Sequence, residues 1–166
     1  VIIHDGGQET AVTNKWILAN AGATVNELLG SYAITTLEGV KFSVGVEPAV
    51  NHLDPASYNM NHPLAPKSPS MHWGWTSGYR FVAMEGQSGT GLSQNYEVHA
   101  LGDGNYFTHT IQTAGITSGS DIIISINADY EMALKDIDVS AGTIVHGEVG
   151  AAATLLQNFN FNVFTS

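Results

Sequence analysis

Val40-Lys41-Phe42-Ser43-Val44-Gly45-Val46 is the stretch of sequence that decides the fold class. Its apolar residues alternate with small or polar ones, and a period of two is typical of a β-strand with one buried face. The four apolar side chains should therefore point into a core, whereas Lys41 and Ser43 should face water.

Similar short runs, bounded by Gly, Asn, Asp and Ser, recur along the chain. The other predicted strands are Lys15–Leu18, Ser31–Thr35, Tyr79–Met84, Tyr96–Leu101, Tyr106–Ile111 and Asp121–Ala128. The last of them begins with apolar residues on both faces, so it is predicted to be a central strand. Helical periodicity is limited to Ala23–Leu29, Tyr130–Lys135 and Ala151–Phe159. The pattern predicts an all-β protein: one domain over residues 1–166, an antiparallel β-sandwich with long loops and short accessory helical turns.

Composition narrows the function classes. The chain has 5 Lys+Arg against 15 Asp+Glu, a balance that disfavours nucleic acid and anionic membrane surfaces as partners. No window approaches the run of about 18 apolar residues that a spanning helix needs, so no membrane span is expected. The absence of Cys excludes disulfides and thiolate ligands. Low charged content with abundant small polar residues is common in secreted β-proteins, so we expect a periplasmic or extracellular location, including the cell surface. Because the chain begins at Val1, we expect a processed or truncated product.

The common enzyme motifs are missing from the sequence. There is no phosphate-binding G-x-x-x-x-G-K-[ST] loop, no G-x-S-x-G elbow and no H-E-x-x-H. Ser, His and Asp are present, but no Ser is marked as activated. The sequence therefore predicts a protein that is not an enzyme.

The seven His residues outnumber Lys and Arg together, and four of them lie in or just beyond a long Pro-rich segment from Glu47 to Ser70. These four are His52, His62, His72 and His99. A long segment without strand pattern is usually functional, and imidazole is the commonest metal ligand. Imidazoles with Met nearby and no thiolate suit copper, with zinc as the rival, better than calcium or magnesium. The cluster Met71-His72-Trp73-Gly74-Trp75 holds two of the three Trp residues, which serve either as a packed corner or beside a metal.

Several segments, in the same order, resemble a family of copper-binding proteins encoded beside methanobactin systems (MbnP-like), which includes copper-repressible surface proteins of methanotrophs. The stretch 44–55, Val-Gly-Val-Glu-Pro-Ala-Val-Asn-His-Leu-Asp-Pro, is similar to the family's GVP...NHxDP segment. The stretch 71–81 with Glu85-Gly86 resembles MxWxWxxGYxFxxxEG. Further matches are the FHLG strand at 96–102, NVD at 126–129 and the late HG at 145–147.

The resemblance implies an antiparallel β-sandwich with one mononuclear copper site, held by two His that map onto His52 and His99. His72 is the third candidate ligand, because its chemistry fits although the family often has Phe or Tyr there. The remaining His residues, His4, His62, His109 and His146, are candidates for surface roles, and His146 is also a candidate for a structural role. The resemblance also implies that the family domain has additional strands before the position of Val1.

In several family members a Trp two residues before the first ligand is oxidised to kynurenine, and a haem-containing oxidising protein is the implied partner. Here that position is Val50. We therefore expect mostly unmodified protein, with any kynurenine confined to Trp73 and Trp75. The leading hypothesis is an exported protein that binds one copper ion per chain for acquisition, storage or handover. The alternative is a structural or adhesive extracellular β-sandwich domain without metal.

Overall fold

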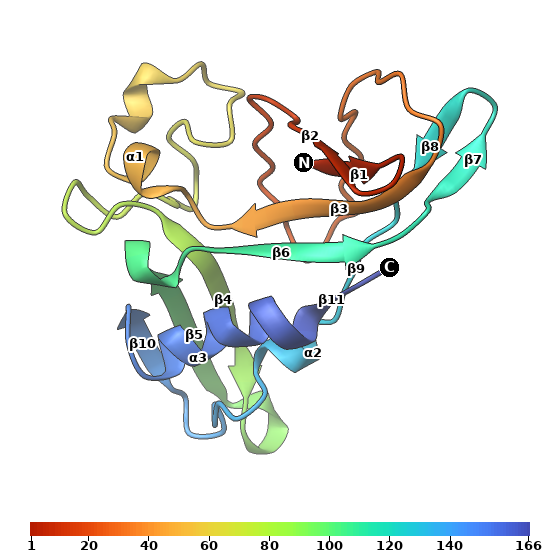
Figure 1. Ribbon diagram of the computed structural model, residues 1–166. Helices are drawn as coiled ribbons and strands as arrows, with labels where there is room; N and C mark the ends of the chain where they lie inside the picture. The colour runs from red at the N-terminus through yellow and green to blue at the C-terminus, as the bar shows by residue number, and fades with distance from the viewer.

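The computed structural model describes residues 1–166 and shows a β-rich chain with few, short helices (Figure 1). The strands are β1 (Ile2–His4), β2 (Gln8–Thr10), β3 (Leu37–Val44), β4 (Arg80–Ser88), β5 (Gln94–Leu101), β6 (Phe107–Gln112), β7 (Ile116–Ser118), β8 (Asp121–Ile123), β9 (Asn127–Ala128), β10 (Ile144–Gly147) and β11 (Phe164–Thr165). The α-helices are α1 (Pro48–Asn51), α2 (Tyr130–Ala133) and α3 (Ala151–Asn158), and a π-helical turn, Phe159–Val163, follows α3 directly. Single 3₁₀ turns lie at Pro55–Ser57, Thr90–Leu92 and Asp103–Asn105. None of the helices combines the length and apolar character needed to cross a membrane.

Two larger sheets and two small ribbons make up the β-structure. One sheet has the strand order β2-β1-β3-β6 and the other β10-β5-β4, while β7 pairs with β8 and β9 with β11. Every pairing is antiparallel except that of β10 with β5, which is parallel. In Figure 1 the four-stranded sheet lies above the three-stranded one, and α3 lies across the latter.

The core follows from the alternating pattern of the strands. In β3, Val40 is buried and Ser43 is exposed, as the period of two predicts, and Val46 beyond the strand is buried. The main apolar cluster joins Val98 and Ala100 of β5 to Leu155 and Leu156 of α3. One face of the β10-β5-β4 sheet is therefore covered by α3.

Sequence analysis placed β3 to β6 and the helical turns α2 and α3 within a few residues, but three other predictions were wrong. Lys15–Leu18 and Ser31–Thr35 form no strand, and Ala23–Leu29 forms no helix. These short runs pair with no other strand, and such runs are not stable as regular elements alone.

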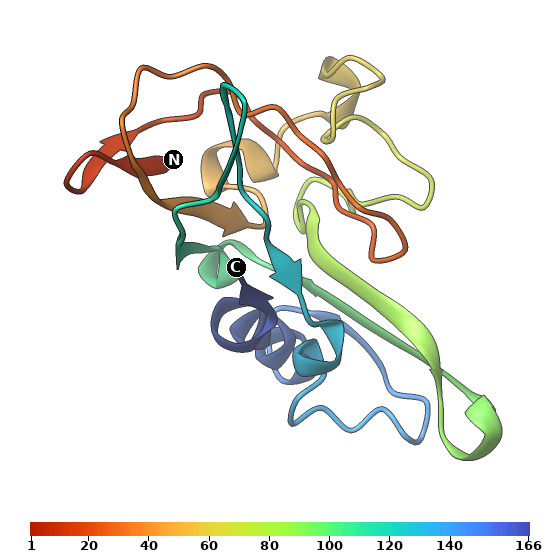
Figure 2. The ribbon, with the colours of Figure 1, turned by 90° about the vertical axis from the view of Figure 1, so that its right-hand side faces the viewer.

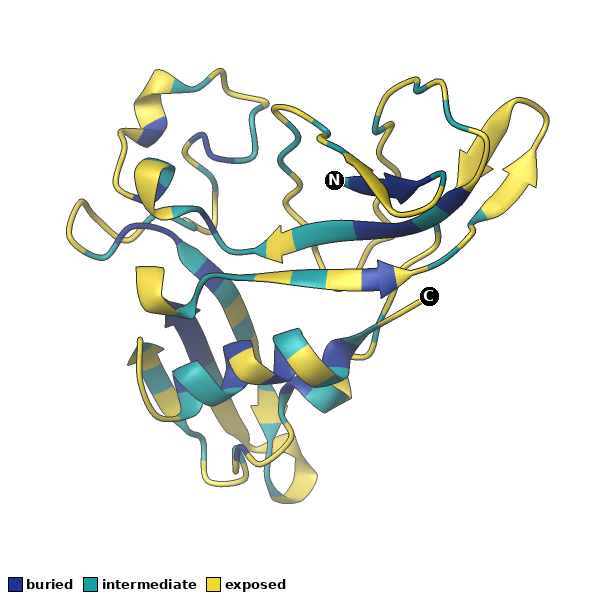
Figure 3. Cartoon of the chain, in the orientation of Figure 1, coloured by how far each residue is buried: buried dark blue, intermediate teal, exposed yellow.

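The predicted central strand Asp121–Ala128 is also corrected. It is divided into β8 and β9, and in β8 Ile122 and Ile123 are 37% and 50% exposed. β8 pairs only with β7, in a projecting ribbon that Figure 3 shows as exposed. Sequence analysis missed β1, whose three residues are all buried. This strand lies in the interior of the four-stranded sheet, between β2 and β3.

Candidate metal centre

The candidate metal centre lies on the face of the β10-β5-β4 sheet opposite α3. In the strand register His99 of β5 pairs with Ala83 of β4 and with His146 of β10. Two pairs further along, Glu97 lies opposite Glu85. Paired residues point to the same face and side chains alternate along a strand, so these two His and two Glu share one face while Val98 points to α3.

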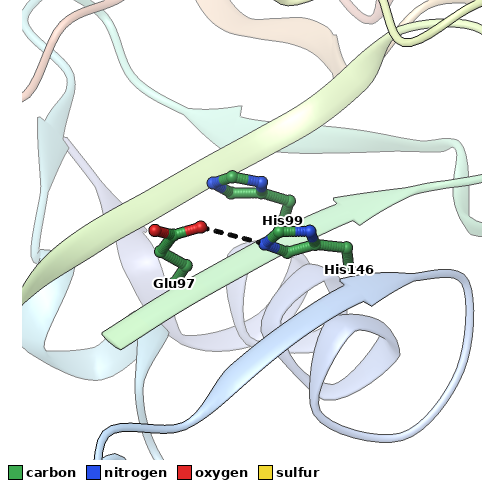
Figure 4. A group of neighbouring side chains, drawn as sticks. All are labelled: Glu97, His99 and His146. Atoms are coloured by element: carbon green, nitrogen blue, oxygen red, sulfur yellow. Dashed lines mark hydrogen bonds and ion pairs between the residues drawn. The ribbon is translucent and has the colours of Figure 1, made fainter. Parts of the chain in front are cut away.

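Glu97, His99 and His146 converge on one point (Figure 4). Each offers a ligand atom, and these atoms all lie within 4.8 Å of one another. The two imidazoles are stacked, with ring centroids 4.2 Å apart and planes 12° from parallel. His146 Nε2 lies 3.1 Å from a Glu97 carboxylate oxygen, and His99 Nε2 lies 2.7 Å from Glu85 Oε1.

His99 is prepared to act as a ligand. His99 is only 3% exposed, and its Nδ1 is buried without any hydrogen-bond partner. Burial lowers the pKa of His99 below its ordinary value, and the charges of Arg80 and His146 lower it further, whereas the hydrogen bond that its ring makes to the Glu85 carboxylate raises it. A neutral imidazole with an unpaired nitrogen is the state that binds a metal ion.

The two carboxylates give this site access to solvent. Glu85 and Glu97 both line an open groove of about 350 Å³ along the β4–β5 hairpin, together with Gln87, Asn95 and Tyr96. A cation can therefore approach the carboxylates of Glu85 and Glu97 from solvent. Two imidazoles with one or two carboxylates form a donor set that suits copper or zinc.

His52, the first predicted ligand, lies outside this group. It follows α1, and its ring is held by the Trp75 carbonyl oxygen, 2.8 Å from Nδ1, and by Asp103 Oδ2, 3.2 Å from Nε2. Both ring nitrogens thus face acceptors. The hydrogen bond to Trp75 raises the pKa of His52 most, and the one to Asp103 raises it further. Its predicted pairing with His99 stays a prediction, and these two hydrogen bonds would have to break before His52 could bind a metal.

His72, the third predicted ligand, also lies outside the group. Its ring packs against Trp75 and Tyr79, with centroids at 5.6 Å and 4.9 Å, and its Nε2 is buried without a partner. Burial lowers the pKa of His72, which favours the neutral ring. The structure therefore gathers His52 and His72 around Trp75, and His99 and His146 around Trp73.

Hydrogen bonds of Asn51 and Tyr79 hold in place the long loop that carries His52 and His72. The fully buried Asn51 accepts a bond from the Tyr79 backbone N–H, at 2.8 Å, and donates to Asp103 Oδ1, at 2.7 Å. Tyr79 donates its hydroxyl to the Leu64 carbonyl oxygen, and burial raises the pKa of Tyr79 to about 12. Gly78 has φ +68°, and a Cβ there would lie 2.5 Å from Asn51, so this turn needs glycine.

His146 is the site residue that sequence analysis assigned elsewhere. It lies in the short run Ile144–Gly147, whose β-branched residues ending at glycine were the available signal for a strand. The parallel pairing of that run with β5 brings His146 next to His99, and no local pattern specifies this pairing.

Comparison with known protein families gives one match. The model of the MbnP family matches residues 1–147, which include all three residues of the group. Neither a curated protein nor a solved structure was found that matches the chain. The match covers most of the sequence, and the chain therefore belongs to the MbnP family, which is associated with methanobactin and copper systems.

Proposed function

We propose that this chain is an exported copper-binding protein, and not an enzyme, that holds one copper ion and serves copper acquisition, storage or handover on a β-sandwich scaffold. The ion is bound by His99 and His146, with Glu97 as a third ligand. The observation that carries this proposal is that one ligand atom from each of these three side chains lies within 4.8 Å of the others, and that His99 among them is buried. Family membership favours copper over zinc as the ion.

The position of the group supports exchange of the ion. Glu85 and Glu97 line the groove that opens to solvent, so a delivering or accepting molecule can approach the ligands from that side. The excess of acidic residues, with a formal net charge of −10, also attracts cations to the molecule. Placement outside the cytoplasm is part of the proposal and rests on the composition of the chain.

Metal analysis of protein purified from its native host tests the proposal. We expect one copper per chain, and copper should displace zinc when both are offered. Protein that carries no copper, and takes up none when copper is added, would support the structural or adhesive alternative.

Copper binding should weaken as the pH falls below about 6.5, because imidazoles coordinate only when neutral. Burial lowers the pKa of His99, so this ligand resists protonation to lower pH than a free imidazole does. Competition with a Cu(I) chelator between about pH 7.5 and about pH 5 measures the effect. An affinity that stays flat over this range would indicate Met or carboxylate ligands instead.

Kynurenine and a haem-containing oxidising partner stay predictions from the family resemblance. Trp73 contacts both site imidazoles and Trp75 contacts His72, whereas Trp16 packs beside His62. Any oxidised indole should therefore be Trp73 or Trp75, because only these lie near the candidate ligands. Peptide mass spectrometry of protein from the native host measures this, and stoichiometric kynurenine at Trp16 would contradict it.

A further inference from the structure

The indole of Trp73 lies against both imidazoles of the candidate metal centre. Its centroid is 5.0 Å from that of His146 and 6.2 Å from that of His99, with interplanar angles of 68° and 80°. The imidazole centroids are only 4.2 Å apart. Together these separations place the indole beside the imidazole pair and not over the outer face of His146, so one indole borders both rings.

A tight hairpin fixes the position of this indole. The Trp73 backbone N–H donates to the Gly78 carbonyl oxygen at 2.8 Å, and the Arg80 N–H donates to that of Met71 at 2.7 Å. The hairpin therefore brings Trp73 to the sheet face that α3 leaves open. On this face Ala83 is exposed but its register partner His99 is buried, and the Trp73 ring borders His99 edge-on.

Trp73 already interacts with one cation. The guanidinium carbon of Arg80 lies over its ring, 5.1 Å from the centroid, and Arg80 Nε is buried without a partner. An indole face attracts cations through its quadrupole. The ring therefore provides an electron-rich surface in contact with the two imidazoles, with the positive charge of Arg80 close behind it.

We propose that Trp73 determines the metal preference of this site, favouring the soft, singly charged Cu(I) over Zn(II); the inference rests on the proposed function. Zinc sites take four ligands, and the indole takes up one side of the imidazole pair, which leaves less room for further ligands there. A soft monovalent ion is satisfied by fewer ligands and gains from contact with the π system. The Arg80 charge repels a divalent ion about twice as strongly as a monovalent one.

Variants of the two neighbouring Trp residues test this inference on the full chain, with Ag(I) as the air-stable probe for Cu(I). In Trp73→Ala the ratio of Ag(I) to Zn(II) affinity should fall roughly tenfold, and Trp73→Phe should restore part of it. Trp75→Ala is the matched control, because Trp75 lies in the same hairpin, is 60% exposed and packs against His72 instead. Its ratio should be that of the wild type.

Tryptophan fluorescence gives a second readout that does not depend on the affinity ratio, and the circular dichroism spectrum of each variant checks that it is folded. Ag(I) should quench the emission of the wild type and of Trp75→Phe, and the quenching should be largely lost in Trp73→Phe. An unchanged affinity ratio in Trp73→Ala, or full quenching in Trp73→Phe, would overturn the inference. A wild type that binds neither ion would instead refute the proposed function, so the two failures are distinguishable.

Discussion

Replacing His99 by Ala should abolish tight copper binding, and replacing His146 by Ala should weaken it by roughly 100-fold or more. The two imidazoles are stacked at 4.2 Å on neighbouring strands and supply the nitrogen ligands of the group. His99 is the buried member with an unpaired nitrogen, so no other side chain can take its place. Competition with a Cu(I) chelator measures both effects.

His109→Ala is the matched control for this experiment. His109 lies in β6 of the other sheet, where its ring packs between Phe42 and Phe164, with both centroids 5.7 Å away. Its loss should leave copper affinity unchanged. A loss of copper in this variant alone would contradict the assignment of the site.

His52→Ala distinguishes the two possible histidine pairs. The family resemblance implies His52 with His99, whereas the geometry places His146 beside His99 and holds His52 on Trp75 and Asp103. We expect His52→Ala to keep most of its copper affinity. If it loses copper as completely as His99→Ala while His146→Ala binds normally, the pair implied by the resemblance is correct and the group described above is not the copper site.

Asn51→Ala should lower the free energy of unfolding by roughly 3 kcal/mol, the second large effect that we expect. The substitution leaves the buried Tyr79 N–H without its acceptor and removes the charge-assisted bond to Asp103. For a chain of this size the melting temperature should fall by roughly 6–12 °C. Thermal and urea unfolding, followed by circular dichroism, measure the change.

Asn59→Ala is the control for this second experiment. Asn59 lies in the same long loop but is exposed, so its replacement should change stability by less than about 0.5 kcal/mol. Equal stability of the two variants would show that the buried Asn51 does not fasten the loop. In that case the hairpin that carries Trp73 would have to be held by other contacts.

The sequence by itself determined the strands that bury one face and the segment that carries candidate ligands. Alternation is a local property, so β3, β4, β5 and β6 could be placed from their residues alone. The same reasoning and the family resemblance singled out His99, which the structure places in the metal group. The prediction of a central strand over Asp121–Ala128 failed. Its apolar residues indicate a strand, but they do not determine whether another element of the fold covers that strand.

Only the tertiary structure decided which residues meet His99. Glu97 and His146 are 49 positions apart in the chain, and they come together because β10 pairs in parallel with β5. Parallel strands are not joined by a tight turn that could fix their register. No pattern in either segment therefore predicts that β5 and β10 pair. The same holds for the contact of Trp73 with both imidazoles, which depends on a hairpin folded over the open face of the sheet. The chemistry of each side chain could thus be inferred from the sequence, whereas strand pairing between distant segments determined which side chains form the site.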